Sequence, residues 1–110
     1  MEVTAKSYTL RTPEGSWLGQ IVLTSDGMFA SVTDWGNFSY SWRSFSGDFR
    51  EFLLGLNVSY FGNKLISGLA YTAHSRKIEQ SIYRYAEKIL PALQEVLKQE
   101  LEQEKNLKIN

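Results

Sequence analysis

Residues 34–65 read DWGNFSYSWRSFSGDFREFLLGLNVSYFGNKL and contain nine aromatic residues. The whole chain has three Trp, six Tyr and six Phe. In the first half of this stretch Phe38, Tyr40 and Trp42 alternate with small or polar residues, which is typical of a half-buried strand. From Phe49 onward the apolar residues recur at helical spacing. The stretch therefore predicts a strand, a short loop and a helix that together supply both layers of one core.

The residues before this stretch predict three more strands, each of which ends in a turn. Residues 2–11 mix apolar residues with Thr and Lys, and the turn that follows carries Pro13 at its second position. Residues 17–24 are rich in aliphatic residues and stop before Asp26 and Gly27, a dipeptide that favours a tight hairpin. We therefore expect a four-stranded antiparallel meander sheet over residues 2–45.

The register of this sheet decides which side chains face the helices. A two-residue loop between the second and third strands places Leu23 opposite Ala30. A three-residue loop over residues 35–37 then places Ala30 opposite Trp42, and we favour this register because it gathers apolar residues on one face. A two-residue second loop would instead set the large aromatic residues beside Phe29, and this alternative stays open.

The second half of the chain predicts two short helices. Asp48 stands three residues before Glu51, a capping-box pattern that starts the first short helix, and Gly55 ends it. Ser59 is then expected to cap the second short helix, which closes at Gly68. Both helices carry apolar residues at helical spacing, so we expect them to cover the sheet.

A long C-terminal helix is predicted from residue 75, with a kink or break near Leu90 because Pro91 interrupts the pattern. Unbroken over residues 75–106, it would reach about 48 Å. A chain of this size has a diameter of only about 35 Å. The helix should therefore either bend at Pro91 and fold back, or project and offer a partner the apolar residues Leu93, Val96, Leu97 and Leu101.

These elements predict an α+β fold in a single domain over residues 1–110, with the sheet over 2–45 followed by helices over 48–107. A chain of 110 residues that is 43% hydrophobic is long enough for one core and too short for two ordinary ones. Twelve basic and twelve acidic residues cancel, so no overall charge draws the protein to nucleic acid or to an anionic membrane. We expect a cytoplasmic protein, since neither a signal peptide nor a membrane-spanning segment is evident.

Composition also argues against catalysis. There is no cysteine, and the single histidine, His74, has no evident metal-binding or catalytic companion. No glycine-rich phosphate loop is present, and Asp34 and Asp48 occupy turn and cap positions that already explain them. We therefore predict that the protein is not an enzyme and has no catalytic residue, metal or cofactor.

Binding remains, because the favoured register places four large apolar residues, with Arg43 among polar neighbours, on the sheet face away from the core. Apolar patches with a polar rim mark interaction sites, although a covering helix would explain this one equally well. The predicted partner-binding residues are Leu18, Val22, Phe29, Trp35 and Arg43 on the sheet, and Leu93, Val96, Leu97 and Leu101 on the long helix.

Residues 34–65 also resemble small uncharacterised proteins of tailed phages and prophages, in which alternating aromatics ending in Trp are followed by DFREFL and YFxxKL helices. This resemblance implies no activity, cofactor or catalytic residue. It implies a phage origin, and similar small phage proteins often bind and inhibit host machinery, including CRISPR and other defence complexes. The partner would then be a host protein complex, met in the host cytoplasm.

The leading prediction is thus a non-enzymatic protein-binding module, an accessory factor that inhibits a host complex. A homodimer through the C-terminal helix is a second partner option, and no membrane partner is expected. The alternative is a nucleic-acid-binding accessory protein with an aromatic sheet face. It is less favoured, because Lys6, Arg11 and Arg43 are few for an electrostatic groove.

Overall fold

The structure, a computed structural model, describes residues 2–69 and 75–109, with side chains up to residue 107. Along the chain the elements are β1 (Ala5–Arg11), β2 (Trp17–Thr24), β3 (Met28–Thr33), β4 (Gly36–Ser41), α1 (Phe49–Leu54), α2 (Val58–Ser67) and α3 (Arg76–Ile109). The strands form one antiparallel sheet in the order β1-β2-β3-β4. The predicted α+β fold, a meander followed by two short helices and a long one, is confirmed.

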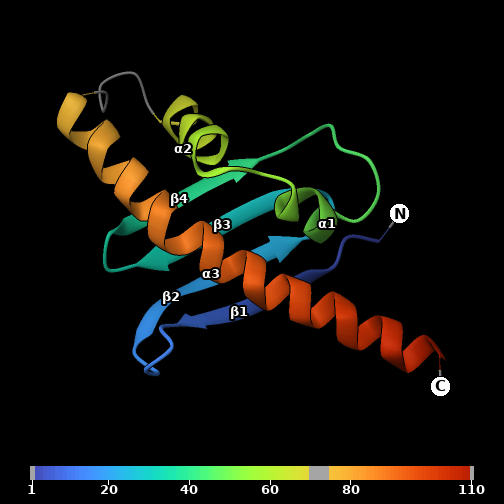
Figure 1. Cartoon of the computed structure of the whole chain (residues 1–110). Coiled ribbons are helices and arrows are strands. Elements are labelled where there is room, and N and C mark those ends of the chain that lie inside the picture. The colour runs from blue at the N-terminus through green and yellow to red at the C-terminus, as the bar shows by residue number, and fades with distance from the viewer. Residues whose placement is uncertain (1, 70–74, 110) are drawn as a thin grey trace.

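The helices form a single layer on one face of the sheet. Figure 1 shows α3 running diagonally across the strands, with α1 and α2 beside it. α3 contacts α1, α2 and β1, whereas α2 also contacts β4. No described element covers the opposite face of the sheet, so the molecule has two layers, one covered sheet face and one open one.

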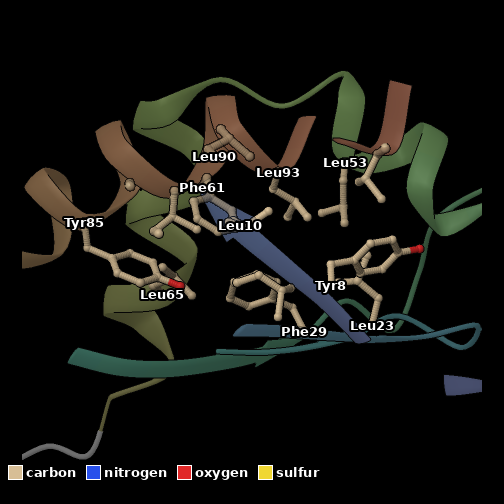
Figure 2. Packing of buried hydrophobic residues seen from close by; sticks show 14 of the residues in the cluster. Tyr8, Leu10, Leu23, Phe29, Leu53, Phe61, Leu65, Tyr85, Leu90 and Leu93 are labelled. Atoms are coloured by element: carbon tan, nitrogen blue, oxygen red, sulfur yellow. The ribbon is translucent and has the colours of Figure 1, made fainter. Parts of the chain in front are cut away.

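The core lies between these two layers (Figure 2). Phe29 of β3 meets Phe61 of α2 edge to face, with ring centroids 5.3 Å apart, and both side chains are fully buried. Burying one such side chain is worth about 1.5–3 kcal/mol. The core draws on both halves of the chain, through Tyr8, Leu10, Ile21, Leu23 and Phe29 from the sheet and Leu53, Phe61, Leu65, Tyr85, Leu90, Leu93 and Leu97 from the helices.

The predicted register of β2 and β3 was wrong by one residue, because Leu23 lies opposite Phe29 instead of Ala30. The loop has three residues, and Gly27 supplies its left-handed conformation at φ 105°. The Thr24 hydroxyl accepts a hydrogen bond from the backbone N–H of Met28 at 3.0 Å, which closes the turn. A slip of one residue turns a strand over, and so Phe29 faces the helices.

The turn between β3 and β4 also differs from the favoured prediction. Thr33 pairs with Gly36, so the loop has two residues, Asp34 and Trp35. Tyr40 consequently stands opposite Phe29. The structure therefore has the arrangement that the sequence left open, in which the aromatic residues of β4 stand beside those of β3 and pack against the core.

The short helices begin and end where polar side chains and glycines allow. Asp48 accepts a hydrogen bond from the backbone N–H of Arg50 at 2.9 Å, and Gly55 caps the other end of α1, as predicted. The predicted cap of α2 was wrong. Asn57, not Ser59, has the extended backbone of a cap, and it accepts from the N–H of Tyr60 at 2.8 Å.

The long helix α3 is continuous through Pro91, so the predicted break does not occur. Pro91 is exposed, and the carbonyl that it leaves without a donor belongs to the exposed residue Glu87, where water can satisfy it. Thirty-four residues at 1.5 Å each span about 51 Å. This length matches the longest molecular extent of 51 Å, so the helix does not fold back.

Candidate protein-binding site

The nine predicted partner-binding residues fall into different environments. Leu18, Phe29, Leu93 and Leu97 are buried in the core, so the prediction that these four face a partner was wrong. The shifted register turns Phe29 inward, and α3 packs Leu93 and Leu97 onto the sheet instead of projecting from Leu93 onward. The remaining residues are at least partly accessible: Val22, Val96 and Leu101 are half-buried, and Trp35 and Arg43 are exposed.

The open face of the sheet is not the aromatic face that the sequence predicted. Its cross-strand rows mix small, polar and aliphatic residues, as where Val22 stands between Ser7 and Ala30 and where Val32 stands between Gln20 and Asn37. Phe38 and Tyr40 pack against the core on the helix side. Base stacking on a ladder of aromatic rings, as nucleic-acid-binding sheets use it, has no counterpart on this face.

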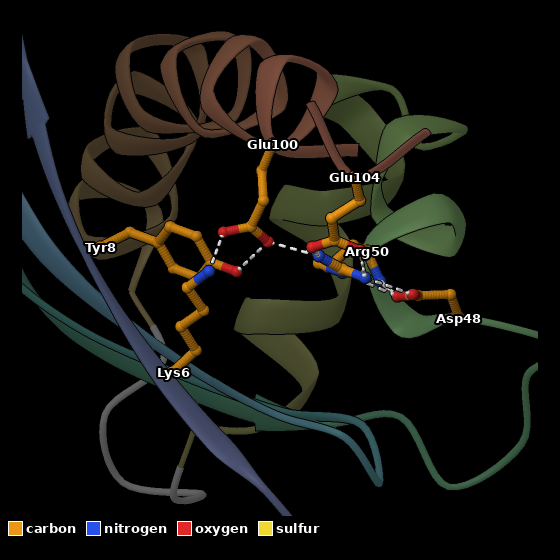
Figure 3. Close-up of polar contacts among 6 residues, drawn as sticks. All are labelled: Lys6, Tyr8, Asp48, Arg50, Glu100 and Glu104. Carbon is orange, nitrogen blue, oxygen red and sulfur yellow. Dashed lines mark hydrogen bonds and ion pairs between the residues drawn. The ribbon is translucent and has the colours of Figure 1, made fainter. Parts of the chain in front are cut away.

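One hollow of about 390 Å³ lies where β1, α1 and the C-terminal half of α3 meet, and a cluster of charged side chains occupies its rim. Figure 3 shows Arg50 at the centre of this cluster. Its guanidinium donates to Asp48 at 2.7 Å, to Glu104 at 2.6 Å and to Glu100 at 2.5 Å. Hydrogen bonds to these carboxylates raise the pKa of Arg50, and the hydrogen bonds to Asp48 have the largest effect.

Glu100 is the second centre of the cluster. It accepts a hydrogen bond from the Tyr8 hydroxyl at 2.8 Å and another from Lys6. Burial alone would raise the pKa of Glu100, but the hydrogen bonds from Lys6, Arg50 and Tyr8 bring it below its ordinary value. The charges of the cluster bind one another, which ties α3 to α1 and β1, and we interpret the cluster as structural.

A second and larger hollow, a groove of about 610 Å³, runs between β4 and α2. Arg43 and Lys64 line it, and neither forms an ion pair within the part of the chain that the structure describes. The Lys64 ammonium lies 5.4 Å from the centre of the Tyr60 ring. The lining of the groove contains no carboxylate and consists of Ser39, Tyr40, Ser41, Trp42, Arg43, Ser44, Tyr60, Lys64 and Gly68.

The backbone of β4 adds unpaired groups to this groove. The N–H of Trp42 donates to Gly27 at 2.8 Å, and the carbonyl of Phe38 accepts from the Ser31 hydroxyl at 3.0 Å, so the even-numbered residues point toward β3. Because successive residues of an antiparallel strand direct their backbone groups to opposite edges, Ser39 and Ser41 point away from β3. No other described residue forms a hydrogen bond with them.

Trp42 forms the floor of the groove. Its ring stacks on Phe61 with centroids 6.2 Å apart and meets the Tyr40 ring at 4.7 Å. Its indole N–H is buried and has no acceptor among the described residues. The groove therefore has an aromatic base, a cation on each side and a strand edge whose outward backbone groups form no hydrogen bond with other described residues.

The part of the chain that the structure describes contains no cluster of metal-binding side chains. No group of three or more Asp, Glu or His side chains in this part of the chain is arranged to hold a metal ion. His74, the single histidine, lies outside the described residues. Of the described helices, none is both long enough and apolar enough to cross a bilayer.

A family model described as a phage family matches residues 1–82. The chain belongs to this phage family. The matched residues include the whole sheet, α1 and α2, so both walls of the groove in this phage protein lie within the family match. The resemblance to phage proteins that residues 34–65 carry is thereby confirmed. No curated protein and no solved structure matches the chain.

The sequence predicted only part of this site. Arg43 was among the predicted partner-binding residues, and it lines the groove. Lys64 and Tyr60 were missed, although both stand on α2 at a spacing of four residues and so share one helix face. That signal places the two side chains together, but only the fold shows that their helix lies beside β4.

Proposed function

We propose that this phage protein is a non-enzymatic protein-binding module and that the groove between β4 and α2 is its contact surface. The observation that carries the proposal is the edge of β4, whose outward backbone groups at Ser39 and Ser41 border a groove with two cations that form no ion pair with any described residue. Unpaired strand edges are templates for another chain. Arg43 and Lys64 supply the electrostatic complementarity that selects a partner.

The partner that we propose is a protein complex of the host, which the phage protein binds and inhibits in the host cytoplasm. Membership of a phage family supports a host partner. A small binding module can inhibit such a complex by occupying a surface that the complex needs. A defence complex of the CRISPR type is one such target.

Nucleic-acid binding is the less favoured function. The aromatic rings of β4 pack against the core and form no exposed ladder on the open sheet face, and the net charge of the chain is zero. Binding that depends on phosphate contacts weakens steeply as the salt concentration rises. Titration with DNA and RNA at two salt concentrations would reveal such binding.

A pull-down from host lysate tests the proposed surface with a matched pair of variants. The double variant Arg43→Glu/Lys64→Glu reverses both groove cations. The control Arg84→Glu/Lys88→Glu reverses two exposed cations on α3 that lie outside the groove. We expect the amount of partner recovered with the groove variant to fall by about tenfold or more, and the amount recovered with the control to stay at the wild-type level. Equal recovery by the two variants would exclude the groove as the contact surface.

A further inference from the structure

We infer that the groove receives an extended, acidic segment of the partner, which adds to β4 as a fifth strand of the sheet. This inference rests on the proposed function and specifies its chemistry. Strand addition uses main-chain hydrogen bonds for affinity and side-chain pockets for specificity. Both components are present beside β4.

The two edges of the sheet are built differently. β1 carries Lys6 and Arg11, and its pairing with β2 is irregular between Leu10 and Arg11. Charged residues and bulges of this kind protect an edge strand from pairing with other chains. β4, with the sequence GNFSYS, has no charged residue, no proline and no shift of register. The β1 edge is therefore protected against pairing with another chain, whereas the β4 edge is able to pair.

Gly68 marks the end of the groove where α2 meets β4. A Cβ atom at this position would lie 3.2 Å from Cδ1 of Tyr40 and 3.6 Å from the carbonyl oxygen of Ser39. An added strand therefore pairs with the edge from Ser39 to Ser41, where β4 ends, and continues beside the irregular residues 42–44. At about 3.3 Å per residue, the paired part of this edge spans roughly 10 Å.

The charges of the groove decide which segment fits. Alternate side chains of an added strand point to opposite faces. Those on the helix side meet Tyr60 and Lys64, while Arg43 borders the far end of the edge. Acidic residues on the side of the strand that faces the groove would neutralise these cations. A second copy of this chain is a poor occupant, because pairing two β4 edges would join two grooves that each carry two cations and no carboxylate.

Three eight-residue probe peptides test this inference: alternating Val and Glu, alternating Val and Lys, and the Val-Glu peptide with two central prolines. Binding is measured by fluorescence anisotropy, and amide hydrogen exchange is followed by NMR. We expect the Val-Glu peptide to bind at least about tenfold more tightly than the other two. Exchange at Ser39 and Ser41 should slow, whereas that of Tyr40, which pairs with β3, and of Trp42, which is bonded to Gly27, should not change.

Two substitutions at one position separate the backbone from the side chain. Ser41→Pro removes the outward N–H of an edge residue, which an edge strand tolerates, whereas Ser41→Ala retains it. We expect Ser41→Pro to abolish binding of the Val-Glu peptide and Ser41→Ala to bind it at least about tenfold more tightly than Ser41→Pro does, with the melting temperature recorded for both. Loss of binding in both variants, or equal binding of acidic and basic peptides, would overturn strand addition.

The two proposals can fail separately. If the Arg43→Glu/Lys64→Glu variant loses the host partner but bound partner does not slow exchange at Ser39 and Ser41, the groove is the contact surface and strand addition is wrong. If the double variant retains the partner, the proposed surface itself is wrong.

Discussion

Arg50 of α1 and Glu104 of α3 are joined by two hydrogen bonds, from Nη1 to Oε2 at 2.6 Å and from Nη2 to Oε1 at 3.0 Å. This bidentate pair connects residues 54 positions apart in the chain. It fixes the C-terminal half of α3 against α1 through the same guanidinium that binds Asp48 and Glu100. Arg50 therefore adds a polar anchor for the C-terminal half of α3, beside the core packing of Leu93 and Leu97.

Replacing this arginine should destabilise the fold. Arg50→Met would remove one of the three hydrogen-bond donors of Glu100, whose side chain is only 14% exposed, and the cation that Asp48 and Glu104 share. We expect the free energy of unfolding to fall by about 1–3 kcal/mol in urea at neutral pH. Arg43→Met serves as the control, because Arg43 is exposed and has no ion pair among the described residues, and its effect should stay within about 0.5 kcal/mol. Equal effects of the two substitutions would contradict a structural role for the cluster.

Stability should also depend on pH through the carboxylates of the cluster. The hydrogen bond from Arg50 is the main cause that lowers the pKa of Asp48 and of Glu104, and the pKa of Glu100 is lowered as well. Groups with a lowered pKa in the folded state stabilise it above their ordinary values of 3.8 and 4.5, and this contribution is lost as the pH falls through the lowered values.

Urea unfolding at a series of pH values measures this contribution. Between about pH 6 and pH 3, the wild-type protein should lose more stability than Arg50→Met, because the variant has already lost the charge that lowers these pKa values. Parallel curves for the two proteins would show that the carboxylates do not depend on Arg50.

The turn between β2 and β3 gives a third prediction. A Cβ atom on Gly27, at φ 105°, would lie 2.1 Å from the carbonyl oxygen of Trp42, whereas one on Gly15, at φ 95°, would meet nothing within 4 Å. Gly15→Ala should therefore show only the backbone cost of about 1–2 kcal/mol. Gly27→Ala should cost about 1–3 kcal/mol more, since the backbone around Trp42 must move. Thermal unfolding of the two variants compares them directly, and similar melting temperatures would contradict the close approach.

For this turn, the sequence predicted the hairpin but not the length of its loop. The alternation of β2 and β3 and the Asp26-Gly27 dipeptide correctly predicted a hairpin. They could not determine whether the loop has two residues or three, because the same dipeptide fits either length and the contacts made by the three-residue loop, from Met28 to Thr24 and from Trp42 to Gly27, are seen only in the fold. Because the loop is one residue longer than predicted, Phe29 lies in the core instead of on the open face.

The charged cluster was beyond sequence reasoning for a different reason. Lys6 and Glu100 are 94 positions apart, and no periodicity relates them. They meet only because α3 crosses the sheet toward β1, a direction set by packing of the whole core. The groove has the same origin, since the edge of β4 and the Lys64 face of α2 become neighbours only in the folded chain.

Truncation of α3 tests how much of this helix the fold needs. Ending the chain after Val96 removes the fully buried Leu97 together with Glu100 and Glu104, and we expect a loss of at least about 3 kcal/mol. Ending it after Lys105 removes Leu107, which is 76% exposed, and should leave the unfolding curve unchanged. Similar stability after both truncations would mean that the C-terminal half of α3 is not docked.

The predicted homodimer through α3 can be examined with the same proteins. Leu93 and Leu97 are buried against the sheet, so the apolar seam that a helix pair would need is already used. We expect light scattering to show a monomer for the intact chain and for the chain ended after Lys105. A dimer that dissociates on this short truncation would instead place a partner contact at the last turns.

Site-specific photocrosslinking in host cells tests the central claim, that the phage protein binds a host protein through the groove beside β4. A benzoyl-phenylalanine replaces Ser41 in one protein and Ser7 in the other, two exposed strand residues of which only Ser41 lines the groove. We predict a single crosslinked host protein from position 41, lost when Arg43→Glu/Lys64→Glu is added, and no adduct from position 7. Crosslinking from position 7 with none from position 41 would contradict the assignment of the groove.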